Sequence, residues 1–393
     1  MASLNTLTGL IAPLYAKRDV ISRELTGLLP AVDIDASSEG AALNQPIRVY
    51  QTPIVASSTA VTPGPTPPDT GGNTVGYTEM TISKVQAIPI QYTGDEAKSL
   101  GDKYTDIVVD RVMQAIRTLA NEMEHDLWLT AYKNASRGYG AAGTNPFATS
   151  NSPVAQLRKI LDDNGAPGAN TPGGRSLVIN TTAGAAYRSL ANNVSVYAAG
   201  TDMTLRNGTI QTLMGFDIKE SAQIGTHTFG TATGLQINGS SADIGDTTVA
   251  VDGSDSGTLL AGDYVEIATG DTNKYMLQDT TQTASGAAAG NIVIGDPGLR
   301  IAHADNDEIT VGEGAASYTP NVAFSRDAIK LLARTPAFSK NDIVLDIIPM
   351  RDPISGIVFT VAHYGGYFQE HIEVSIAYGY KAIKPRHIAV LVG

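Results

Sequence analysis

The sequence predicts a mixed α+β fold, with one long helix and a β-rich domain inserted into the second half of the chain. Three observations lead to this prediction. A stretch of about thirty residues repeats apolar side chains at helical spacing, and segments of β character flank it on both sides. Residues 231–317 lack helical periodicity and carry most of the net charge. The 393 residues, 42% of them hydrophobic, suffice for two or three packed domains.

Composition excludes several classes of protein. The chain has no cysteine, which excludes a disulfide framework, Cys-ligated zinc, an iron–sulfur cluster and a thiol nucleophile. A net charge of −12 argues against a broad basic face for nucleic acid. The apolar patch at 7–16 precedes its basic residues, the reverse of a secretory signal, and no apolar run is long enough to cross a bilayer. We therefore expect a soluble protein made in the cytosol.

Residues 13–27 are expected to form a short amphipathic helix. Leu14, Ile21 and Leu25 fall on one face, and the pattern ends at Gly27. A helix this short is unstable alone, so it must dock on another surface. That surface belongs either to its own domain or to a neighbouring subunit.

Residues 47–100 are expected to contain a long two-stranded β-ribbon. Segments 47–54 and 77–90 have strand character. The Pro/Gly-rich tip between them, 61–72, can be neither helix nor central strand. Its prolines include Pro63, Pro65, Pro67 and Pro68. Because such a ribbon cannot bury itself, either it lies along another molecule or its tip is disordered.

Residues 102–133 carry the strongest helical pattern. At 1.5 Å per residue they form a rod of about 45 Å, and the single apolar stripe predicts packing against a sheet. Glu122 and His125 have the spacing of carboxylate-bridged iron ligands. Such sites need two copies of this motif, so we interpret these residues as part of a solvated helix face.

Residues 136–230 alternate helical and strand patterns. The segment Gly138–Gly143 has the letters of a dinucleotide-binding loop but follows a helix instead of a strand, so we interpret it as a flexible turn. The other elements are expected as helices at 152–161 and 181–191 and strands at 176–180 and 214–220. Together they indicate an α+β core.

Residues 231–317 are interpreted as an acidic β-domain. Five short strands recur between Gly, Asp and Ser turns at barrel-like spacing, at 247–251, 263–268, 274–278, 291–295 and 308–312. Thirteen acidic residues stand against two basic ones here, whereas the rest of the chain is nearly neutral. These acids include Asp243, Asp246, Asp252, Asp255, Asp305, Asp307 and Glu308. Their turns lack the twelve-residue spacing of a calcium loop.

After Pro320 the pattern of the core resumes. Residues 321–334 have apolar spacing that predicts a helix. Strands are expected after it at 343–348, 357–363, 369–377 and 378–392. The insertion therefore splits a single α+β domain.

The sequence carries no catalytic or cofactor pattern. Its six histidines have no metal-ligand spacing, and it holds neither a Gly-x-Ser-x-Gly elbow nor a phosphate-binding loop. His363 lies in an apolar strand and is interpreted as a core residue. We predict no enzymatic activity, no cofactor and no metal site.

The order of these parts resembles the major capsid (coat) protein of tailed double-stranded DNA bacteriophages, in particular the podovirus type with an inserted β-barrel domain. The stretches that carry the resemblance are Ile11–Tyr15, Asp19–Leu25, Leu259–Ala268, Asn321–Ala328 and Tyr378–Pro385. The resemblance extends over nearly the whole chain.

This resemblance implies a domain plan for the tailed-phage capsid fold. The plan comprises an N-terminal arm (1–46), an extended β-loop (47–100), the spine helix of a peripheral domain (101–135), the axial domain with the remaining peripheral core (136–230), the barrel-like insertion (231–317) and a return segment (318–393). It further implies intersubunit contacts through the N-terminal apolar face and the Pro-rich tip. It also places the insertion, with the seven acids named above, on the outer surface of the assembly.

The resemblance also implies partners. Hexamers and pentamers of this chain would close an icosahedral shell in the virion, assembled in the host bacterial cytoplasm with a scaffolding protein and a portal. The shell would enclose double-stranded DNA without sequence-specific binding and without a membrane.

Two other functions stay open. An encapsulin-like nanocompartment would share the fold and enclose protein cargo instead of DNA. An acidic extracellular adhesin or glycan hydrolase would explain the Gly, Thr and Asp content. The sequence, however, shows neither the secretory signal that an extracellular protein needs nor the recognisable carboxylate pair of a glycan hydrolase.

Overall fold

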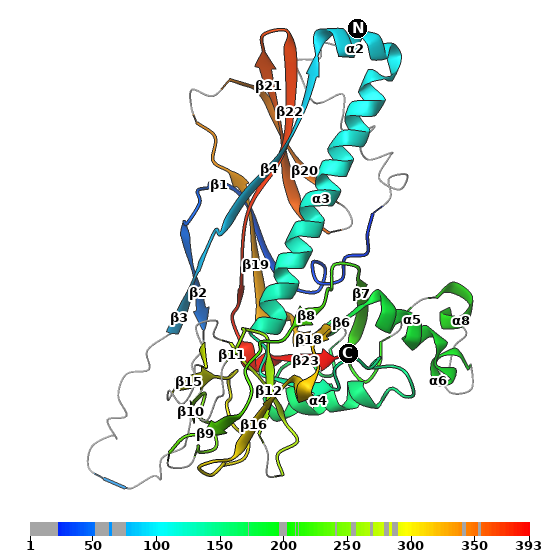
Figure 1. The fold of residues 1–393 in the computed structure, drawn as a ribbon. Helices are drawn as coiled ribbons and strands as arrows, with labels where there is room; N and C mark the ends of the chain where they lie inside the picture. Colours follow the sequence, from blue (N-terminus) through cyan, green and yellow to red (C-terminus); the bar gives the residue numbers. More distant parts are fainter. Residues whose placement is uncertain are drawn as a thin grey trace.

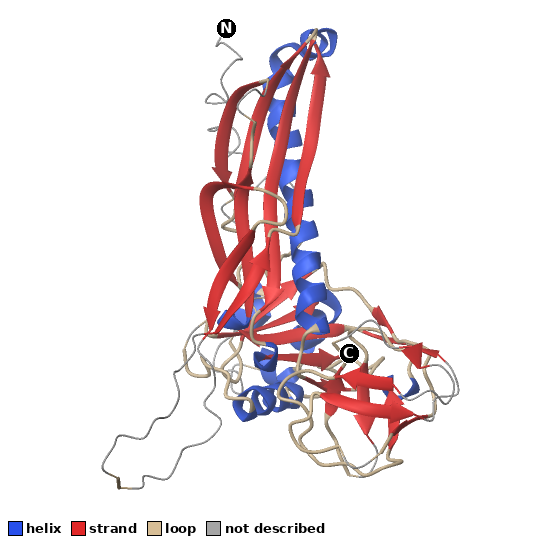
Figure 2. Ribbon diagram, turned by 90° about the vertical axis from the view of Figure 1, so that its left-hand side faces the viewer, coloured by secondary structure: helices blue, strands red, loops and turns tan. Residues whose placement is uncertain are grey.

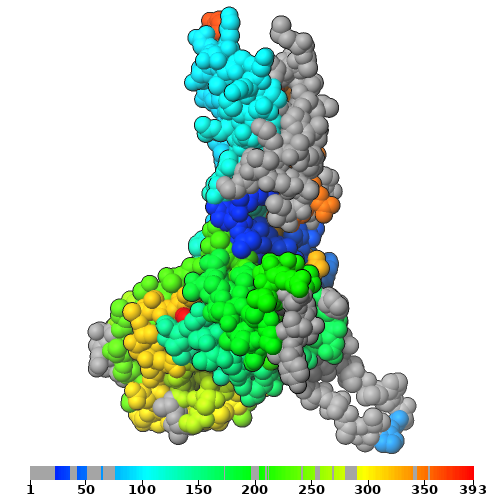
Figure 3. Space-filling view, turned by 90° about the vertical axis from the view of Figure 1, so that its right-hand side faces the viewer, coloured from blue at the N-terminus to red at the C-terminus, as the bar shows by residue number. Residues whose placement is uncertain are grey.

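The chain folds into an elongated arm that rises from a broader base (Figures 1 and 2). This computed structural model describes residues 23–51, 63–64, 76–171, 173–195, 203–208, 210, 212–239, 242–252, 257–267, 270–278, 283–284, 290–339, 343–352 and 355–393. The space-filling view shows the same division into a narrow upper part and a wide lower part (Figure 3). The predicted mixed α+β class is confirmed.

The arm is built on a six-stranded sheet. Its strands are β1 (Asp33–Ala41), β4 (Lys84–Thr93), β19 (Ile329–Pro336), β20 (Val344–Arg351), β21 (Val358–Gly366) and β22 (Gln369–Ala382). The order is β1-β19-β22-β21-β20, with β4 paired to the other side of β22. Alternate residues of β22, such as Ile372, Val374 and Ile376, belong to the largest hydrophobic cluster. One face of this sheet is therefore a packing surface.

The helix α3 (Tyr104–Lys133) supplies the other side of that cluster, and it runs along the arm into the base (Figure 1). Two shorter elements precede it, α2 (Gly94–Leu100) and η1 (Gly101–Lys103). The predicted long helix against a sheet is confirmed. Two of its charged residues, Glu124 and Asp126, are buried instead of facing solvent.

The base contains a sheet with helices on both faces. Its strands are β5 (Arg137–Gly140), β6 (Arg175–Asn180), β7 (Asp217–Ser221), β18 (Pro320–Ser325) and β23 (Ile388–Val392). Val322 and Phe324 of β18 join the α3 cluster, whereas Ala323 joins a second cluster with α4 (Ser152–Asp163). The other helices here are α5 (Thr181–Ser189), α6 (Ala191–Val194) and α8 (Met203–Asn207).

The predicted helix at 321–334 is wrong. The segment forms β18 and β19, separated by the short turn η3 (Arg326–Ala328). All six residues of β18 are buried because the strand is covered on both faces. A strand buried on both faces lacks the alternation of apolar and polar residues by which strands are predicted. Its apolar residues can therefore fall at spacings that predict a helix.

The β-rich insertion closes on itself. Its strands are β9 (Leu235–Ile237), β10 (Thr248–Asp252), β12 (Tyr264–Ile267), β13 (Lys274–Met276), β15 (Gly290–Val293) and β16 (Glu308–Val311), in the order β15-β10-β9-β16-β12-β13. A bridge between Leu277 and Ile294 joins the two ends of this order. These strands enclose a separate hydrophobic cluster that includes Val249, Val265 and Ile309. We call this unit the barrel.

The barrel is joined to the base by two strand pairings. The short strands β8 (His227–Thr228) and β17 (Ser317–Tyr318) pair where the chain leaves and re-enters the base. Strand β13 pairs with β5, which makes one continuous sheet of base and barrel. The interpretation of residues 138–143 as a flexible turn is therefore wrong for residues 138–140, which belong to β5; Gly138 pairs with both Lys274 and Val390. The remaining small elements are β11 (Gly257–Thr258), β14 (Thr283–Ala284), η2 (Gly312–Gly314) and η4 (Pro385–His387).

The predicted β-ribbon is shorter than expected. Strand β2 (Pro46–Gln51) pairs with β3 (Gly76–Thr81), and these two strands alone form a two-stranded sheet. The expected second strand, 77–90, breaks after Thr81, and its later part is β4 of the arm sheet. The expectation that the whole ribbon lacks a partner within the chain is therefore wrong for β4. We call the pair β2–β3 the ribbon.

Candidate assembly surfaces

The N-terminal segment is attached to the arm by two ion pairs. Arg23 bonds Asp352 at 2.6 Å between Nη1 and Oδ1. Glu24 bonds Arg117 and accepts a hydrogen bond of 2.7 Å from Asn121, and these contacts lower the pKa of Glu24 to about 2. The described residues 23–27 are not helical, so the predicted helix at 13–27 is wrong in this part.

Of the three apolar residues predicted as contacts, the structure describes only Leu25. Leu25 exposes 54% of its surface, and Leu14 and Ile21 lie outside the described residues. Two residues that the sequence pattern did not single out, Leu28 and Leu29, are completely buried against α3. Their burial fixes the course of the chain after Leu25.

A buried carboxylate holds the turn that follows. The two oxygens of Glu124, which has no exposed surface, accept hydrogen bonds from the amides of Gly27, Leu28 and Leu29 at 2.6, 2.7 and 2.8 Å. Burial raises the pKa of Glu124, while these amides and the Ser221 hydroxyl oppose that rise. Since buried amides need partners, this carboxylate ties the N-terminal segment to α3.

The ribbon presents aromatic side chains to solvent. Tyr50 and Tyr77 lie opposite each other in the register and expose 72% and 51% of their surfaces. The guanidinium of Arg48 lies 4.7 Å from the ring centroid of Tyr77 and bonds Glu79 at 3.2 Å. At the other end, Met80 is buried against the arm sheet. The ribbon is thus anchored at its root, with an exposed apolar surface toward its tip.

Most of the predicted Pro-rich tip lies outside the described residues. Pro63 is described and exposed, whereas Pro65, Pro67 and Pro68 are not among the described residues. Their role as contacts remains a prediction.

The distal end of the arm carries a second exposed aromatic pair. Tyr367 and Phe368, in the turn between β21 and β22, expose 88% and 78% of their surfaces, and their rings make an edge contact with centroids 4.6 Å apart. Gly94 at the start of α2 donates a hydrogen bond of 3.1 Å to the Phe368 carbonyl, which holds the turn on the arm. The sequence analysis did not identify this pair. Two aromatic residues between the adjacent strand patterns could have indicated it.

The barrel surface carries the predicted acids in part. Asp243, Asp246, Asp305 and Glu308 are exposed, Asp252 and Asp307 are half-buried, and Asp255 lies outside the described residues. Several of these carboxylates hold turns: Asp246 accepts from the amide of Asp243 at 2.9 Å, and Asp305 accepts from that of Gly239 at 2.9 Å. The exposed acids therefore both shape the loops and give them negative charge.

Two other barrel acids are buried with histidines. Nε2 of His227 lies 2.8 Å from Asp263 Oδ1, and Nε2 of His303 lies 3.3 Å from Asp271 Oδ2. The Tyr132 hydroxyl lies 3.2 Å from the other ring nitrogen of His227, and burial raises the pKa of Tyr132 to about 12. Because Tyr132 belongs to α3, the first pair connects the barrel to the spine of the molecule.

The described residues contain no group of three His, Asp or Glu side chains arranged to hold a metal ion. His363 is buried, with Nε2 at 2.8 Å from Glu370, in agreement with its interpretation as a core residue. Within the described part of the chain, no helix is both long and apolar enough to span a membrane.

No protein-family model and no curated protein sequence matches the chain. Three solved structures illustrate the likenesses found. A structure described as Mycobacterium phage Che8 is 13% identical, with 94% of this chain and 92% of that chain covered and a TM-score of 0.47. The capsid structure of the cyanophage P-SCSP1u is 12% identical, with 94% and 89% covered and a TM-score of 0.47. A virus-like particle from Pyrococcus furiosus is 10% identical, with 98% and 97% covered and a TM-score of 0.37. These identities and TM-scores are too low to transfer a function.

Proposed function

We propose that this chain is the major capsid protein of a tailed double-stranded DNA bacteriophage. Many copies assemble as hexamers and pentamers into an icosahedral shell, and the chain acts as a structural protein, not as an enzyme. The sequence resemblance suggests this role, and the shape and exposed surfaces of the subunit support it.

One observation carries the proposal: the subunit places exposed aromatic surface on projections at separate ends of the molecule. The ribbon exposes Tyr50 and Tyr77, and the arm end exposes Tyr367 and Phe368. Clustered large apolar side chains on protruding elements are unfavourable in water and are typical of surfaces that partners cover. Contacts at several separate places on one subunit are what a closed shell of identical copies needs.

We assign the ribbon and its Pro-rich tip to contacts with a neighbouring subunit. The ribbon root is fixed by Met80 and Ile82 in a small cluster with Leu332 and Ala377 of the arm sheet. An anchored root with an exposed outer part lets the ribbon lie along a second copy without unfolding the first.

The charge distribution favours a shell that encloses DNA without binding it tightly. The acidic barrel would face outward, away from the genome, and the nearly neutral remainder would line the interior. A scaffolding protein and a portal are the further partners of assembly in the bacterial cytoplasm. Free subunits should not retard double-stranded DNA at physiological salt, because binding of DNA depends on clustered basic residues.

Shell formation can be tested by concentrating the purified chain and examining it by sedimentation and negative-stain microscopy. We expect closed, hollow particles of uniform diameter, and we expect Tyr50→Ser/Tyr77→Ser to remain monomeric under the same conditions. A chain that stays monomeric at every concentration would overturn the proposal. Particles that enclose a specific protein and exclude DNA in the producing cell would instead establish the nanocompartment.

A further inference from the structure

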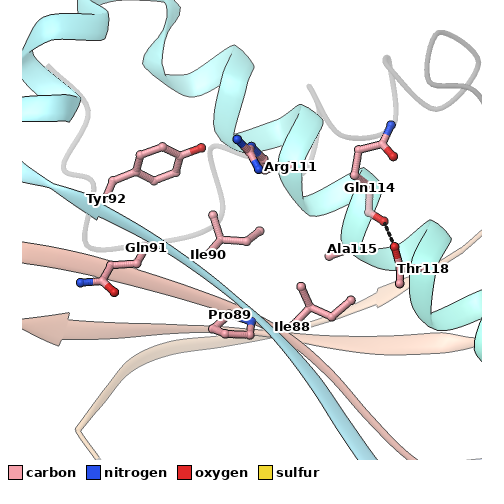
Figure 4. A pocket seen from close by; sticks show the side chains of 9 residues that line it. All are labelled: Ile88, Pro89, Ile90, Gln91, Tyr92, Arg111, Gln114, Ala115 and Thr118. Atoms are coloured by element: carbon pink, nitrogen blue, oxygen red, sulfur yellow. Dashed lines mark hydrogen bonds between the residues drawn. The ribbon is translucent and has the colours of Figure 1, made fainter.

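Buried polar groups without an aligned hydrogen bond mark the places where burial is least compensated. In the described part of the chain, one such group is the hydroxyl of Tyr92, which Figure 4 shows projecting toward Arg111 in a groove of about 310 Å³ between α3 and β4. Another is the ammonium of Lys274 in β13. Burial of a charge costs far more than burial of a neutral hydroxyl, so the surroundings of Lys274 have the larger consequence for the fold.

Lys274 lies between two carboxylates. Its Nζ atom is 2.6 Å from Glu266 Oε1 on β12 and 2.6 Å from Glu313 Oε1 in η2, and it lies 4.7 Å from the centroid of the Tyr264 ring. The side chain of Lys274 is only 8% exposed. One ammonium neutralises one carboxylate, so two ionised carboxylates leave one negative charge in excess at this site.

Among the described residues, the strands on either side bring no second positive charge to this cluster. On the side of β5, Lys274 pairs with Gly138, which has no side chain. The adjacent Arg137 bonds two asparagine side chains instead. On the side of β16, Glu266 pairs with Thr310, which is uncharged. The excess negative charge is therefore left to the two carboxylates themselves.

These two carboxylates take up protons in separate steps. Burial raises the pKa of Glu266, and the adjacent Glu313 carboxylate adds to the rise while Lys274 opposes it. Burial acts in the same direction on Glu313, but the Lys274 ammonium and the Tyr264 hydroxyl, which donates at 3.3 Å, lower the pKa of Glu313 overall. On acidification Glu266 is thus protonated first, while Glu313 keeps the charge that pairs with Lys274.

The cluster lies at the seam between base and barrel, where β13 pairs with β5. This pairing covers only two residues of each strand, Lys274 with Gly138 and Tyr275 with Arg137. Because the pairing is so short, the side-chain interactions beside it contribute to its stability.

We propose that Lys274, Glu266 and Glu313 form a proton-operated latch on this seam, in which uptake of one proton strengthens the attachment of the barrel to the base. The proton removes the repulsion between the two carboxylates, while the ion pair with Lys274 remains. For an acid whose pKa is raised by folding, the folded state binds the proton more tightly, so stability rises as the pH falls through that pKa. A second proton would leave the buried ammonium without a counter-charge, so stronger acid weakens the seam again. This inference does not depend on shell assembly.

The absence of cysteine from the chain allows a direct measurement of the seam. Met276 of β13 is fully buried in the cluster that contains α3, so Met276→Cys places a thiol that reacts when the seam opens. An aromatic disulfide reagent that stays reactive in mild acid labels this thiol, and its rate is divided by that of the same variant unfolded in urea at the same pH. From about pH 7.5 to about pH 5.5, above the range of an ordinary Glu, we expect this normalised rate to fall about threefold.

Glu266→Gln imitates the latch with one proton bound, because the amide has the shape of the carboxyl group and no charge. In the Met276→Cys background this variant should label slowly at both pH values, at the rate that the unaltered cluster reaches in mild acid. Glu308→Gln is the matched control, because Glu308 is an exposed acid on β16 of the same barrel, and it should keep the threefold response. Faster labelling of the Glu266→Gln variant near neutral pH, or an unchanged pH response in it, would overturn the proposal.

A second thiol separates opening of the seam from unfolding of the whole molecule. Val374 is fully buried in the arm sheet, so Val374→Cys reports on the arm and on global unfolding. We expect Glu266→Gln to leave the normalised rate at this position unchanged. Equal responses of the two thiols would show that the carboxylates act on global stability, and the latch would be refuted.

Discussion

At the scale of single residues, the N-terminal attachment depends on side chains that sequence patterns misplace. Glu124 and Asp126 lie in a run of charges that predicts a solvated helix face, yet both are buried. Glu124 binds three backbone amides, and Asp126 accepts hydrogen bonds from Lys84 and from the Tyr378 hydroxyl. Their partners come from distant parts of the chain, so no local spacing could have predicted them.

Glu124→Ala should destabilise the protein strongly. The change leaves three buried amides without an acceptor, and we expect the free energy of unfolding to fall by about 3 kcal/mol or more. Urea denaturation followed by circular dichroism measures this loss. Glu122→Ala is the matched control, because Glu122 is exposed on the same turn of α3. Equal losses in the two variants would contradict the role given to Glu124.

Glu24 should make the N-terminal attachment sensitive to acid. Arg117 and Asn121 hold the pKa of Glu24 at about 2, below its value in the unfolded chain. For an acid whose pKa is lowered by folding, the stabilisation is present above the unfolded pKa and disappears as the pH falls through the folded one. The stability difference between the native chain and Glu24→Gln should therefore shrink between about pH 5 and pH 2. A difference that is constant over this interval, measured by urea denaturation, would exclude this contribution.

At the scale of elements, the length of an apolar run and what borders it decide which predictions succeed. The helix α3 has one buried stripe beside polar residues, so its spacing predicts both its type and its length. The strands β6 and β23 are apolar runs shorter than a typical helix, so their length favours strands. Strand β18 is equally buried, but the turn at Arg326–Ala328 joins its pattern to that of β19 and produces a false helical period.

The ribbon tip should be required for assembly and dispensable for folding. Deleting 61–72 leaves the β2–β3 pairing and the cluster at its root intact, so we expect an unchanged urea midpoint. Particle yield under the conditions given above should fall at least tenfold. A normal yield from the deletion variant would show that the tip makes no essential contact between subunits.

The arm end offers a sharper test, because two side chains carry its exposed surface. Tyr367→Ser/Phe368→Ser removes apolar area that is already in water, so the stability of the free subunit should change by less than about 0.5 kcal/mol. Assembly should need a higher protein concentration. Light scattering across a concentration series measures the shift, and an unchanged threshold would remove the arm end from the set of contacts.

At the scale of the whole molecule, the barrel is both separate and attached. It has its own hydrophobic cluster and a closed strand order, yet β13 continues the sheet of the base through β5. At this seam the ammonium of Lys274, one of two basic residues in the insertion, lies 2.6 Å from each of Glu266 and Glu313. The excess of acidic residues predicted the insertion, but it did not predict that one sheet continues from the base into the barrel.

Removing the barrel should expose the base to aggregation. A short Gly/Ser linker can replace residues 231–316, because Thr228 and Ser317 are paired neighbours. The replacement leaves the edge of β5 without its β13 partner, and an open strand edge is a template for pairing between chains. We expect retained secondary structure by circular dichroism together with aggregates in size-exclusion chromatography. A truncated subunit that is as monodisperse and as competent for assembly as the full chain would contradict this role.

The sequence by itself determined the α+β class, the long helix and the acidic β-rich insertion, because periodicity and charge are local properties. Only the tertiary structure decided the pairing of β13 with β5, the two strands at 321–334, the three amides gathered by Glu124 and the aromatic pair at the arm end. Each of these depends on contacts between residues far apart in the chain, which no local pattern encodes. The net charge shows the same division: its sum is fixed by composition, but the tertiary fold decides which acids face solvent and which, like Asp263 and Asp271, are buried beside histidines.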